Sequence, residues 1–440
     1  MRVNFVPQKY INQVINGLSA LHEHMTKTGQ LDANLIKEFM EPIFKEAGYR
    51  DKQKKPQNIL ILHDAGIGDF IIMSAAIREI RRIYPNAHIT LLINKTSLAM
   101  AELCPYVDEI ITSDSNTLKL NNVLGFFKIS IDTAKHLLKH RIDIAFNFGQ
   151  YPSSQLVAYM SGANEIVEER WEVNVNESFK LGLIPMNFFG CLSNFKSDFK
   201  KLVKPHLNES NLYILQDYTK TKIKDKRLEV WLSPRDKFVA ETILQPFNGQ
   251  NLCAIVMGGN RNLSCKKWAA DNYAKLMNML LEREKIIFVI LGGADEVEEG
   301  KIIESLVKSD NLINLTDRIS LRQSAAVLNL CDLYIGNDTG LMHAAAAFKI
   351  PILSPNCYPA DKEMPVTASP QRYYPYAVPS VLIQPRHSLP ECKDKFDLSG
   401  CTFKDRPHCI NQITPEIMLK GMEYLKQRIE QKAGEPLFFS

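Results

Sequence analysis

The sequence lacks the features that mark membrane and secreted proteins. No run approaches the ~18 consecutive apolar residues that a membrane-spanning helix requires. The stretch from Met1 to Tyr10 is mixed and polar, without the apolar core of a secretory signal peptide. The nine cysteines are odd in number and spread over 440 residues, which does not suit a disulfide framework. We therefore expect a cytoplasmic protein in a reducing compartment.

Three motifs that bind nucleotides or metal–diphosphates are also missing. There is no G-x-x-x-x-G-K-[ST] loop, which argues against a P-loop kinase or ATPase. No two aspartates lie two positions apart, so the chain has no Asp-x-Asp pair to hold a metal–diphosphate. Ile71 stands where a dinucleotide fingerprint that starts at Gly66 needs its third glycine, which disfavours an NAD-dependent dehydrogenase.

Charge and composition are those of an average globular protein. The 53 Lys and Arg against 49 Asp and Glu leave a net charge of +4, which is too small to indicate a nucleic-acid partner. That charge permits an anionic ligand or loose membrane attachment. Hydrophobic residues make up 45% and charged residues 23%, so we expect a folded chain. At roughly 100–200 residues per domain, the length suggests two or three domains.

The spacing of apolar residues divides the chain into a short helical segment and two α/β halves. Helical spacing at Leu35, Phe39 and Ile43 predicts a helical extension over 1–55. Two domains follow, over 56–235 and 236–440. In the first we predict strands at 59–63, 89–93, 107–111 and 142–148, and helices at 70–84 and 206–218. In the second we predict strands at 253–257, 286–291 and 333–335, helices at 268–284, 295–308, 320–330 and 341–348, an irregular segment at 357–412 and a closing helix at 415–432. Alternating strands and helices predict a doubly wound α/β fold.

A glycine-containing loop follows the first predicted strand, at Gly66, Gly68 and Asp69. Two glycines let the backbone approach a ligand closely, and the N-terminus of the following helix attracts anions. Asp69 opens that helix, so two interpretations stay open. It is either a catalytic carboxylate or an N-cap that satisfies helix amides, and the two roles are compatible.

A second glycine-containing loop follows the first predicted strand of the other half. Gly258 and Gly259 end that strand, and Lys266 comes shortly after them. Glycine amides together with a cation are typical of a phosphate cradle. The alternative is a surface turn with solvated lysines.

A third loop links a predicted strand to an Ala-rich helix and contains Asp338, Thr339, Gly340, Leu341 and His343. In open α/β sheets, ligands bind at the carboxyl ends of the strands. The first amides of the helix would point at an anion there, and the helix dipole would add attraction. The alternative is a capping aspartate and a histidine that faces the core.

Four cysteines gather in the irregular segment: Cys357, Cys392, Cys401 and Cys409. Four thiolates can hold zinc or iron. Their spacings are loose, however, and no C-x-x-C pair occurs. The other interpretation is a set of buried or partly exposed thiols.

Taken together, these blocks resemble a known family. The stretch ILILHDAGIGDFIIMSAAIREIRRIYPNAHITLLI (59–93) resembles the opening of glycosyltransferase family 9, the bacterial ADP-heptose:lipopolysaccharide heptosyltransferases. The stretch LTDRISLRQSAAVLNLCDLYIGNDTGLMHAAAAFKIPIL (315–353) resembles the donor-site segment of that family, and GGN followed by KKWAADNYAKLM resembles its phosphate-binding stretch. The resemblance spans roughly residues 58–430.

The resemblance implies a GT-B architecture, in which two Rossmann-like domains face a cleft. The N-terminal domain would hold the acceptor, with Gly66 and Gly68 in the loop on the acceptor side, and the C-terminal domain would hold the nucleotide-sugar. It implies an inverting reaction that requires no metal or other cofactor. Asp69 falls on the proposed general base, and Lys266 on a lysine that contacts donor phosphate, with Lys267 as the alternative register. The residues from Asp338 to His343 match the donor motif, and Glu296 or Glu298 matches an acidic residue that holds the ribose.

The expected partners are a nucleotide-sugar, with ADP-heptose first, and a glycan or glycolipid acceptor. The acceptor stays open among lipid A–core, another surface glycan and a protein of the autotransporter type. Peripheral contact with the inner membrane and the oligomeric state are also open. The alternatives to transfer are a non-catalytic nucleotide-sugar binding protein and a nucleotide-sugar epimerase.

Overall fold

The structure is a computed structural model that describes residues 8–28, 33–49, 55–113, 123–149, 151–169, 192–197, 206–258, 266–362, 369–390, 396–397, 400–401 and 408–440. The chain forms two compact units. Unit 1 comprises Met1–Gly66, Ala75–Val203 and Asn208–Lys226, and unit 2 comprises Ile67–Ser74, Lys204–Leu207 and Arg227–Ser440. The first turns of helix α3 (Ile67–Ile83) therefore belong to unit 2, although the rest of the helix belongs to unit 1.

Unit 1 is built on a six-stranded parallel sheet in the order β3-β2-β1-β4-β5-β6. The strands are β1 (Asn58–His63), β2 (His88–Asn94), β3 (Glu109–Ser113), β4 (Ile144–Asn147), β5 (Glu165–Glu169) and β6 (Phe195–Ser197). β1 lies between β2 and β4 and is buried along its whole length, which explains its unbroken apolar run. The four strands predicted in this half are present. β5 and β6 escape prediction because β5 is rich in glutamate and β6 has three residues.

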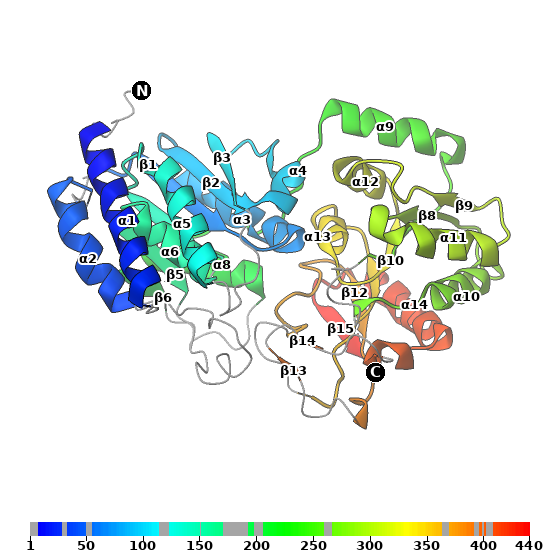
Figure 1. Ribbon diagram of the computed structural model, residues 1–440. Coiled ribbons are helices and arrows are strands. Elements are labelled where there is room, and N and C mark those ends of the chain that lie inside the picture. The colour runs from blue at the N-terminus through cyan, green and yellow to red at the C-terminus, as the bar shows by residue number, and fades with distance from the viewer. Residues whose placement is uncertain are drawn as a thin grey trace. The chain divides into compact units, whose positions relative to one another are not determined.

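The helices of unit 1 cover both faces of this sheet (Figure 1). They are α1 (Gln8–Thr28), α2 (Ala33–Glu46), α4 (Leu98–Ala101), which the 3-10 turn η1 (Lys95–Ser97) precedes, α5 (Val123–Leu137), α6 (Pro152–Met160) and α8 (Leu207–Thr219), together with most of α3. α1 packs against α2 and α5, and the buried side chains of α1 and α2 share one core with those of α5, α6 and β1. On the other face, the ring of Phe146 in β4 contacts Tyr84 and Tyr218, which follows from the alternation of side chains along a strand.

Unit 2 is built on a seven-stranded parallel sheet in the order β15-β12-β11-β10-β7-β8-β9. The strands are β7 (Leu252–Val256), β8 (Ile287–Leu291), β9 (Leu312–Asn314), β10 (Leu333–Gly336), β11 (Ile352–Pro355), β12 (Ser380–Ile383) and β15 (Pro436–Phe439), with a separate hairpin of β13 (Phe396–Asp397) and β14 (Gly400–Cys401). The predicted irregular segment is wrong at β12, which is buried within the sheet. Four residues beside prolines are too few to show a period.

The helices of unit 2 are α9 (Pro234–Leu244), α10 (Ala270–Leu281), α11 (Val297–Leu306), α12 (Leu321–Leu328), α13 (Gly340–Ala347) and α14 (Pro415–Glu430), with short 3-10 turns η5 (Gln245–Phe247), η7 (Ala294–Glu296) and η10 (Cys409–Gln412). α10, α11 and α14 share a core with inward side chains of the central strands. α12 packs against α9 and α13, and α13 also packs against β10 and β11. The strands and helices of this unit thus confirm the predicted α/β class.

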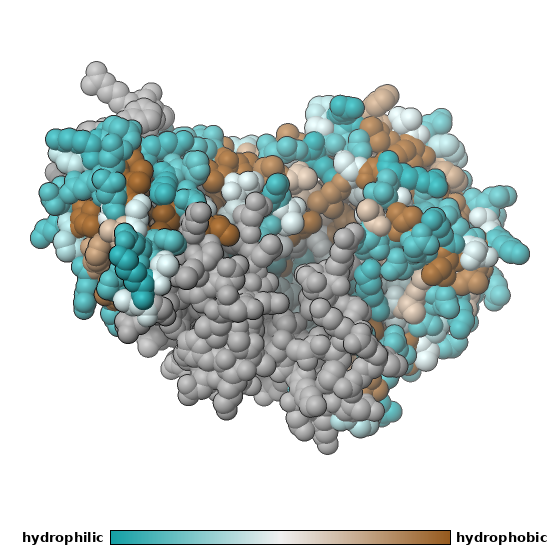
Figure 2. All heavy atoms as spheres, viewed as in Figure 1, coloured by the Kyte–Doolittle hydropathy of each residue, from teal (hydrophilic) through white to brown (hydrophobic). Residues whose placement is uncertain are grey.

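The outer surface of the molecule is mainly hydrophilic on the face that Figure 2 shows, with apolar side chains scattered over the helices. The largest exposed apolar side chain on α9 is Phe238, at 68% exposure. Among the described residues, no helix combines the length and the apolar character needed to cross a bilayer.

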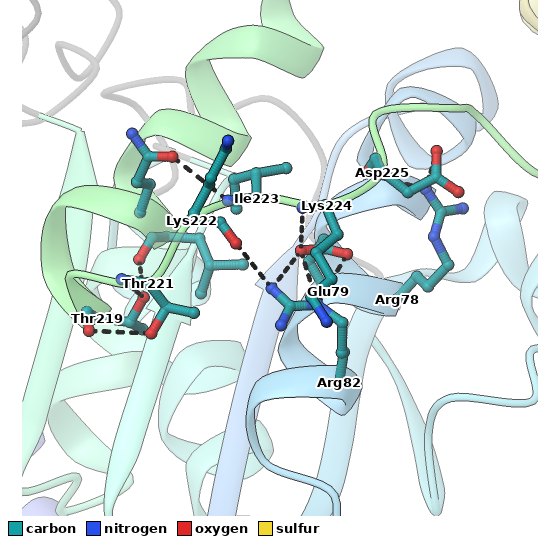
Figure 3. Close-up of polar contacts among 11 residues, drawn as sticks. Arg78, Glu79, Arg82, Thr219, Thr221, Lys222, Ile223, Lys224 and Asp225 are labelled. Atoms are coloured by element: carbon teal, nitrogen blue, oxygen red, sulfur yellow. Dashed lines mark hydrogen bonds and ion pairs between the residues drawn. The ribbon is translucent and has the colours of Figure 1, made fainter.

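The segment that follows α8 is fastened to α3 by polar contacts (Figure 3). The guanidinium of Arg82 pairs with the buried Glu79 carboxylate at 2.6 Å and donates to the carbonyl of Lys222 at 3.0 Å. The amide of Lys224 donates to Glu79 at 3.0 Å, and Arg78 pairs with Asp225 at 3.4 Å. Burial would raise the pKa of Glu79, but these partners outweigh it and hold the pKa below its ordinary value.

Candidate functional site

An ion pair joins two of the predicted donor-site loops. The Nζ of Lys266 lies 2.8 Å from Oδ2 of Asp338, although 72 residues separate them in the chain. Burial would lower the pKa of Lys266, but the Asp338 carboxylate outweighs it and holds the pKa well above its ordinary value. For Asp338, the Lys266 ammonium in turn overcomes the effect of burial and lowers the pKa. Both groups are therefore charged at neutral pH.

The side chain of Lys267 makes different contacts from that of Lys266, and this distinguishes the two adjacent lysines. Its Nζ lies 3.2 Å from Glu299 and 3.7 Å from Glu296, at the start of α11. Lys266, and not Lys267, is therefore the lysine beside Asp338 at the carboxyl end of β10.

His343 lies in the first turn of α13 and is buried. Its Nε2 is 3.8 Å from Oδ1 of Asp338. Burial lowers the pKa of His343, and the carboxylates of Asp338 and Asp69 offset this only in part. The imidazole is therefore neutral at neutral pH. Asp69 lies close enough to His343 to raise the pKa of the imidazole electrostatically.

Asp69 is the third residue of α3 and not its cap. The helix begins at Ile67 and its N-cap is Gly66, so the interpretation of Asp69 as an N-cap is wrong. A carboxylate in the first turn still interacts favourably with the helix dipole. Because Gly66 already forms the N-cap of α3, the side chain of Asp69 is not needed for capping.

The starts of α3 and α13 pack closely, and two glycines make this approach feasible. A Cβ on Gly68 would lie 2.6 Å from Cδ2 of His343, and a Cβ on Gly340 would lie 2.7 Å from Cγ2 of Ile67. Both distances are shorter than real Cβ contacts, so any larger residue would push the helices apart. Both helix starts belong to unit 2. Gly68 therefore acts by bringing Asp69 beside His343.

The N-terminus of α13 presents backbone amides. Thr339 is its N-cap, in an extended conformation, and its side chain makes no capping hydrogen bond within the described residues. The amides of a first helical turn have no partner inside the helix, so those of Gly340 and Leu341 can receive an anion. The capping aspartate that the sequence left open at 338 is wrong, since Thr339 takes that place.

Asn337 is a structural residue of this site to which the sequence reasoning assigned no role. It is fully buried, and its Nδ2 donates to the carbonyl of Met257 at 2.5 Å. Its Oδ1 accepts from the hydroxyl of Tyr273 at 2.8 Å and from the amide of Trp268 at 3.3 Å. Asn337 thus ties the end of β10 to the end of β7 and to the segment before α10. The sequence feature that indicates Asn337 is a polar residue directly after a buried strand.

Of the two acidic residues proposed near the ribose, only Glu296 lies close to the loops. Its carboxylate accepts from the amide of Gly293 at 2.9 Å, and a Cβ on Gly258 would lie 3.5 Å from its Cδ. Glu298 is 78% exposed and pairs with Lys301 on the surface. Gly259 lies outside the described residues.

The predicted cysteine cluster is described only in part. Cys357 is a free thiol, and the Sγ of Cys409 accepts from the amide of Leu389 at 3.4 Å. Cys392 lies outside the described residues, and so does the side chain of Cys401. Cys357 lies near enough to Lys266 to affect its pKa, which places it at the edge of the donor-site group.

Known proteins share both the sequence pattern and the fold. Residues 192–355 match the family model described as glycosyltransferase family 9 (heptosyltransferase). The lipooligosaccharide heptosyltransferase 2 of Campylobacter jejuni is 24% identical over 288 residues, which cover 64% of this chain and 76% of that protein. Lipopolysaccharide heptosyltransferase 2 of Salmonella typhimurium is 32% identical over a shorter stretch of 92 residues, 20% of this chain and 26% of that protein.

Two solved structures show the same architecture. A family 9 glycosyl transferase from Veillonella parvula has a TM-score of 0.63 at 18% identity, covering 85% of this chain and 98% of that one. The ADP-heptose LPS heptosyltransferase II of E. coli has a TM-score of 0.58 at 18% identity, covering 85% and 100%. The predicted GT-B architecture is thus confirmed. The match to this family model over residues 192–355, together with the loops after β1, β7 and β10, supports the assignment of the chain to glycosyltransferase family 9, as a glycosyltransferase.

Proposed function

We propose that this enzyme transfers a heptose from ADP-heptose to a hydroxyl of a lipopolysaccharide-core or related surface-glycan acceptor, with inversion and without a divalent metal. The observation that carries the proposal is the group formed by Asp69, His343, Asp338 and Lys266. It sets a carboxylate beside a cation and a helix N-terminus. The names of the relatives support heptose and the lipopolysaccharide core as the substrates.

Asp69 would act as the general base. The acceptor oxygen forms a bond to the anomeric carbon while the bond from that carbon to the diphosphate breaks, and the acceptor proton passes to the Asp69 carboxylate. Attack from the face opposite the leaving group inverts the anomeric configuration. Its placement in the first turn of α3, near His343, would make it effective.

Lys266 and the amides at the start of α13 would receive the charge of the departing ADP. Preorganised cations and amides stabilise charge that develops in a transition state, which is what a metal does in other transferases. Asp338 would hold Lys266 in place at 2.8 Å until the diphosphate binds. His343, held neutral, adds no positive charge of its own, so Lys266 is the cation of this group.

The protein would work at the cytoplasmic face of the inner membrane, where a glycolipid acceptor and a nucleotide-sugar are both accessible. A protein acceptor is the alternative for the same chemistry. Acceptors of both kinds belong in the test, because the residues assigned above act on the donor and on the attacking hydroxyl, which both kinds of acceptor offer.

The test measures release of ADP by the purified enzyme with ADP-heptose and a heptose-deficient lipopolysaccharide core. We expect ADP release that depends on the acceptor, survives EDTA and yields a product with the opposite anomeric configuration. Loss of activity in EDTA that magnesium or manganese restores would overturn the metal-free proposal. Conversion of donor without acceptor would indicate an epimerase, and donor binding without turnover on any acceptor would indicate a binding protein.

A further inference from the structure

Three potential metal ligands converge at the amino-terminal edge of the sheet in unit 1. His88 begins β2, Glu109 begins β3, and His140 lies in the turn between α5 and β4. β2 and β3 are parallel neighbours, so their first residues meet at the same edge of the sheet. This edge lies opposite the one where β1 leads into α3, and none of the proposed donor residues takes part.

Both imidazoles point at one carboxylate oxygen. The Nε2 of His140 lies 3.2 Å from Oε2 of Glu109, and the Nε2 of His88 lies 3.5 Å from the same oxygen. The two rings stack, with centroids 5.4 Å apart and planes 22° apart. One ligand atom from each residue lies within 4.8 Å of the other two.

These separations suit a metal better than they suit hydrogen bonds. Zinc ligands at about 2.0–2.1 Å in a tetrahedron are about 3.3 Å apart, close to the two nitrogen–oxygen distances. Ordinary N–H···O bonds are about 2.9 Å long. Within the described part of the chain, the Nε2 of His88 is buried and makes no hydrogen bond.

We propose that His88, Glu109 and His140 bind a zinc ion, with water in the fourth position. Two imidazoles and one carboxylate form a mixed nitrogen and oxygen ligand set that zinc accepts. The ion links β2, β3 and the turn after α5. Its role is structural, because the proposed transfer chemistry uses residues beyond the opposite, carboxyl-terminal edge of this sheet and residues of unit 2.

Lys139 provides a sharp test because it competes with the metal. Its Nζ lies 3.3 Å from Oε1 of Glu109, the oxygen that the imidazoles do not approach. The side chain is 48% exposed, so it can turn into solvent when the metal binds. Lys139→Gln removes the competing charge without touching a ligand, and we expect zinc to bind about three- to tenfold more tightly.

The experiment titrates the metal-stripped full-length protein with Zn²⁺, and with Co²⁺ as a spectroscopic probe. We expect one site per chain whose Co²⁺ spectrum shows nitrogen and oxygen ligands without thiolate bands. Glu109→Gln and His88→Asn should each weaken binding at least about 100-fold. His136→Asn, an exposed histidine on the same helix that precedes His140, should change nothing.

Circular dichroism serves to check that the ligand variants are folded. The result for Lys139→Gln does not depend on the folding of those variants. The proposal is overturned by any of three results. The first is no binding at micromolar Zn²⁺. The second is thiolate bands in the Co²⁺ spectrum, which would assign the metal to cysteines. The third is an unchanged zinc affinity in both Glu109→Gln and Lys139→Gln.

Discussion

At the scale of single residues, Asp69 combines a place in the first turn of α3 with proximity to His343. Asp69→Asn keeps the size of the side chain but cannot accept a proton at neutral pH. General-base catalysis is worth roughly 10²–10⁴-fold, so we expect turnover to fall by about that factor while ADP affinity stays the same. Steady-state kinetics and ADP titration measure the two quantities.

Asp271→Asn is the matched control for Asp69. Asp271 also lies in the first turn of its helix, α10, so its variant loses the same favourable interaction with a helix dipole. It should keep full turnover. If Asp69→Asn is folded and turns over as fast as Asp271→Asn, the base has to be another residue.

Substitutions of Lys266 and Lys267 distinguish the proposed donor contact from a neighbouring, partly buried ion pair. Lys266→Ala removes the cation beside Asp338 and leaves that carboxylate without its partner at 2.8 Å, so ADP affinity and turnover should both fall, by at least about tenfold. Lys267→Ala breaks only contacts with Glu296 and Glu299 and should change each by less than about threefold. Isothermal titration with ADP decides between them, and the reverse order would shift the donor contact to Lys267.

Glu168 makes stability depend on pH. It is fully buried at the end of β5. Burial raises its pKa to about 7, although the side-chain amides of Gln155 and Asn147 donate to it. Its pKa is about 4.5 in the unfolded chain, so folding favours the protonated form. The stability that this provides is complete below about pH 4.5 and is lost as the pH rises to 7, by about 3 kcal/mol.

Glu168→Gln removes this titration. Relative to the unchanged protein, the variant should gain about 3 kcal/mol in free energy of unfolding between pH 4.5 and 8, since the neutral amide has no charge to bury. Urea unfolding at pH 5 and at pH 8 measures the difference. An equal difference at both pH values would mean that Glu168 is ionised in the folded state.

At the scale of elements, α2 is attached to unit 1 through one side only. Phe44 is fully buried, and the centroid of its ring lies 6.1 Å from that of Tyr49 and 5.8 Å from that of Tyr159. Phe39 on the same helix is 36% exposed. Phe44→Ala should lower the free energy of unfolding by about 3–5 kcal/mol, and Phe39→Ala by less than about 1 kcal/mol. Urea unfolding of the two variants tests this, and equal losses would mean that α2 does not pack as described.

This packing gives the helices of residues 1–55 a structural role. Their apolar side chains share a core with α5 and α6, so deleting them would expose that core to water. Our further prediction is a role of these helices in acceptor docking or assembly. It is better tested by substitutions on exposed positions such as Phe39 than by deletion.

At the scale of the whole molecule, all of the proposed donor residues lie in unit 2. ADP at ~100 times its dissociation constant should add about 2.7 kcal/mol to the free energy of unfolding of that unit. Because Phe44 lies in unit 1, Phe44→Ala should leave the ADP affinity and this increment unchanged. Thermal unfolding with and without ADP measures it, and loss of the increment in the variant would show that donor binding depends on the core of unit 1.

The sequence by itself determined the local elements and the loops that carry the chemistry. Apolar runs and helical spacing predict β1, β2, α3 and most elements of unit 2, because each pattern needs only one element and its nearest layer. The glycines and aspartates at 66–69 and 336–343 are recognisable in the sequence. A helix N-terminus that binds an anion needs accessible backbone amides, and few residue types leave them accessible. Short strands such as β6 and β12 carry too few residues for a period, so they escaped prediction.

Only the tertiary structure decided which distant groups meet. The pair of Lys266 and Asp338, the contacts of Asn337 with β7 and α10, and the convergence of His88, Glu109 and His140 each join segments on different strands. Strand order and register bring these segments together, and both result from packing over the whole sheet. Periodicity reports which face of an element is buried, but it carries no information about which element lies on the other side.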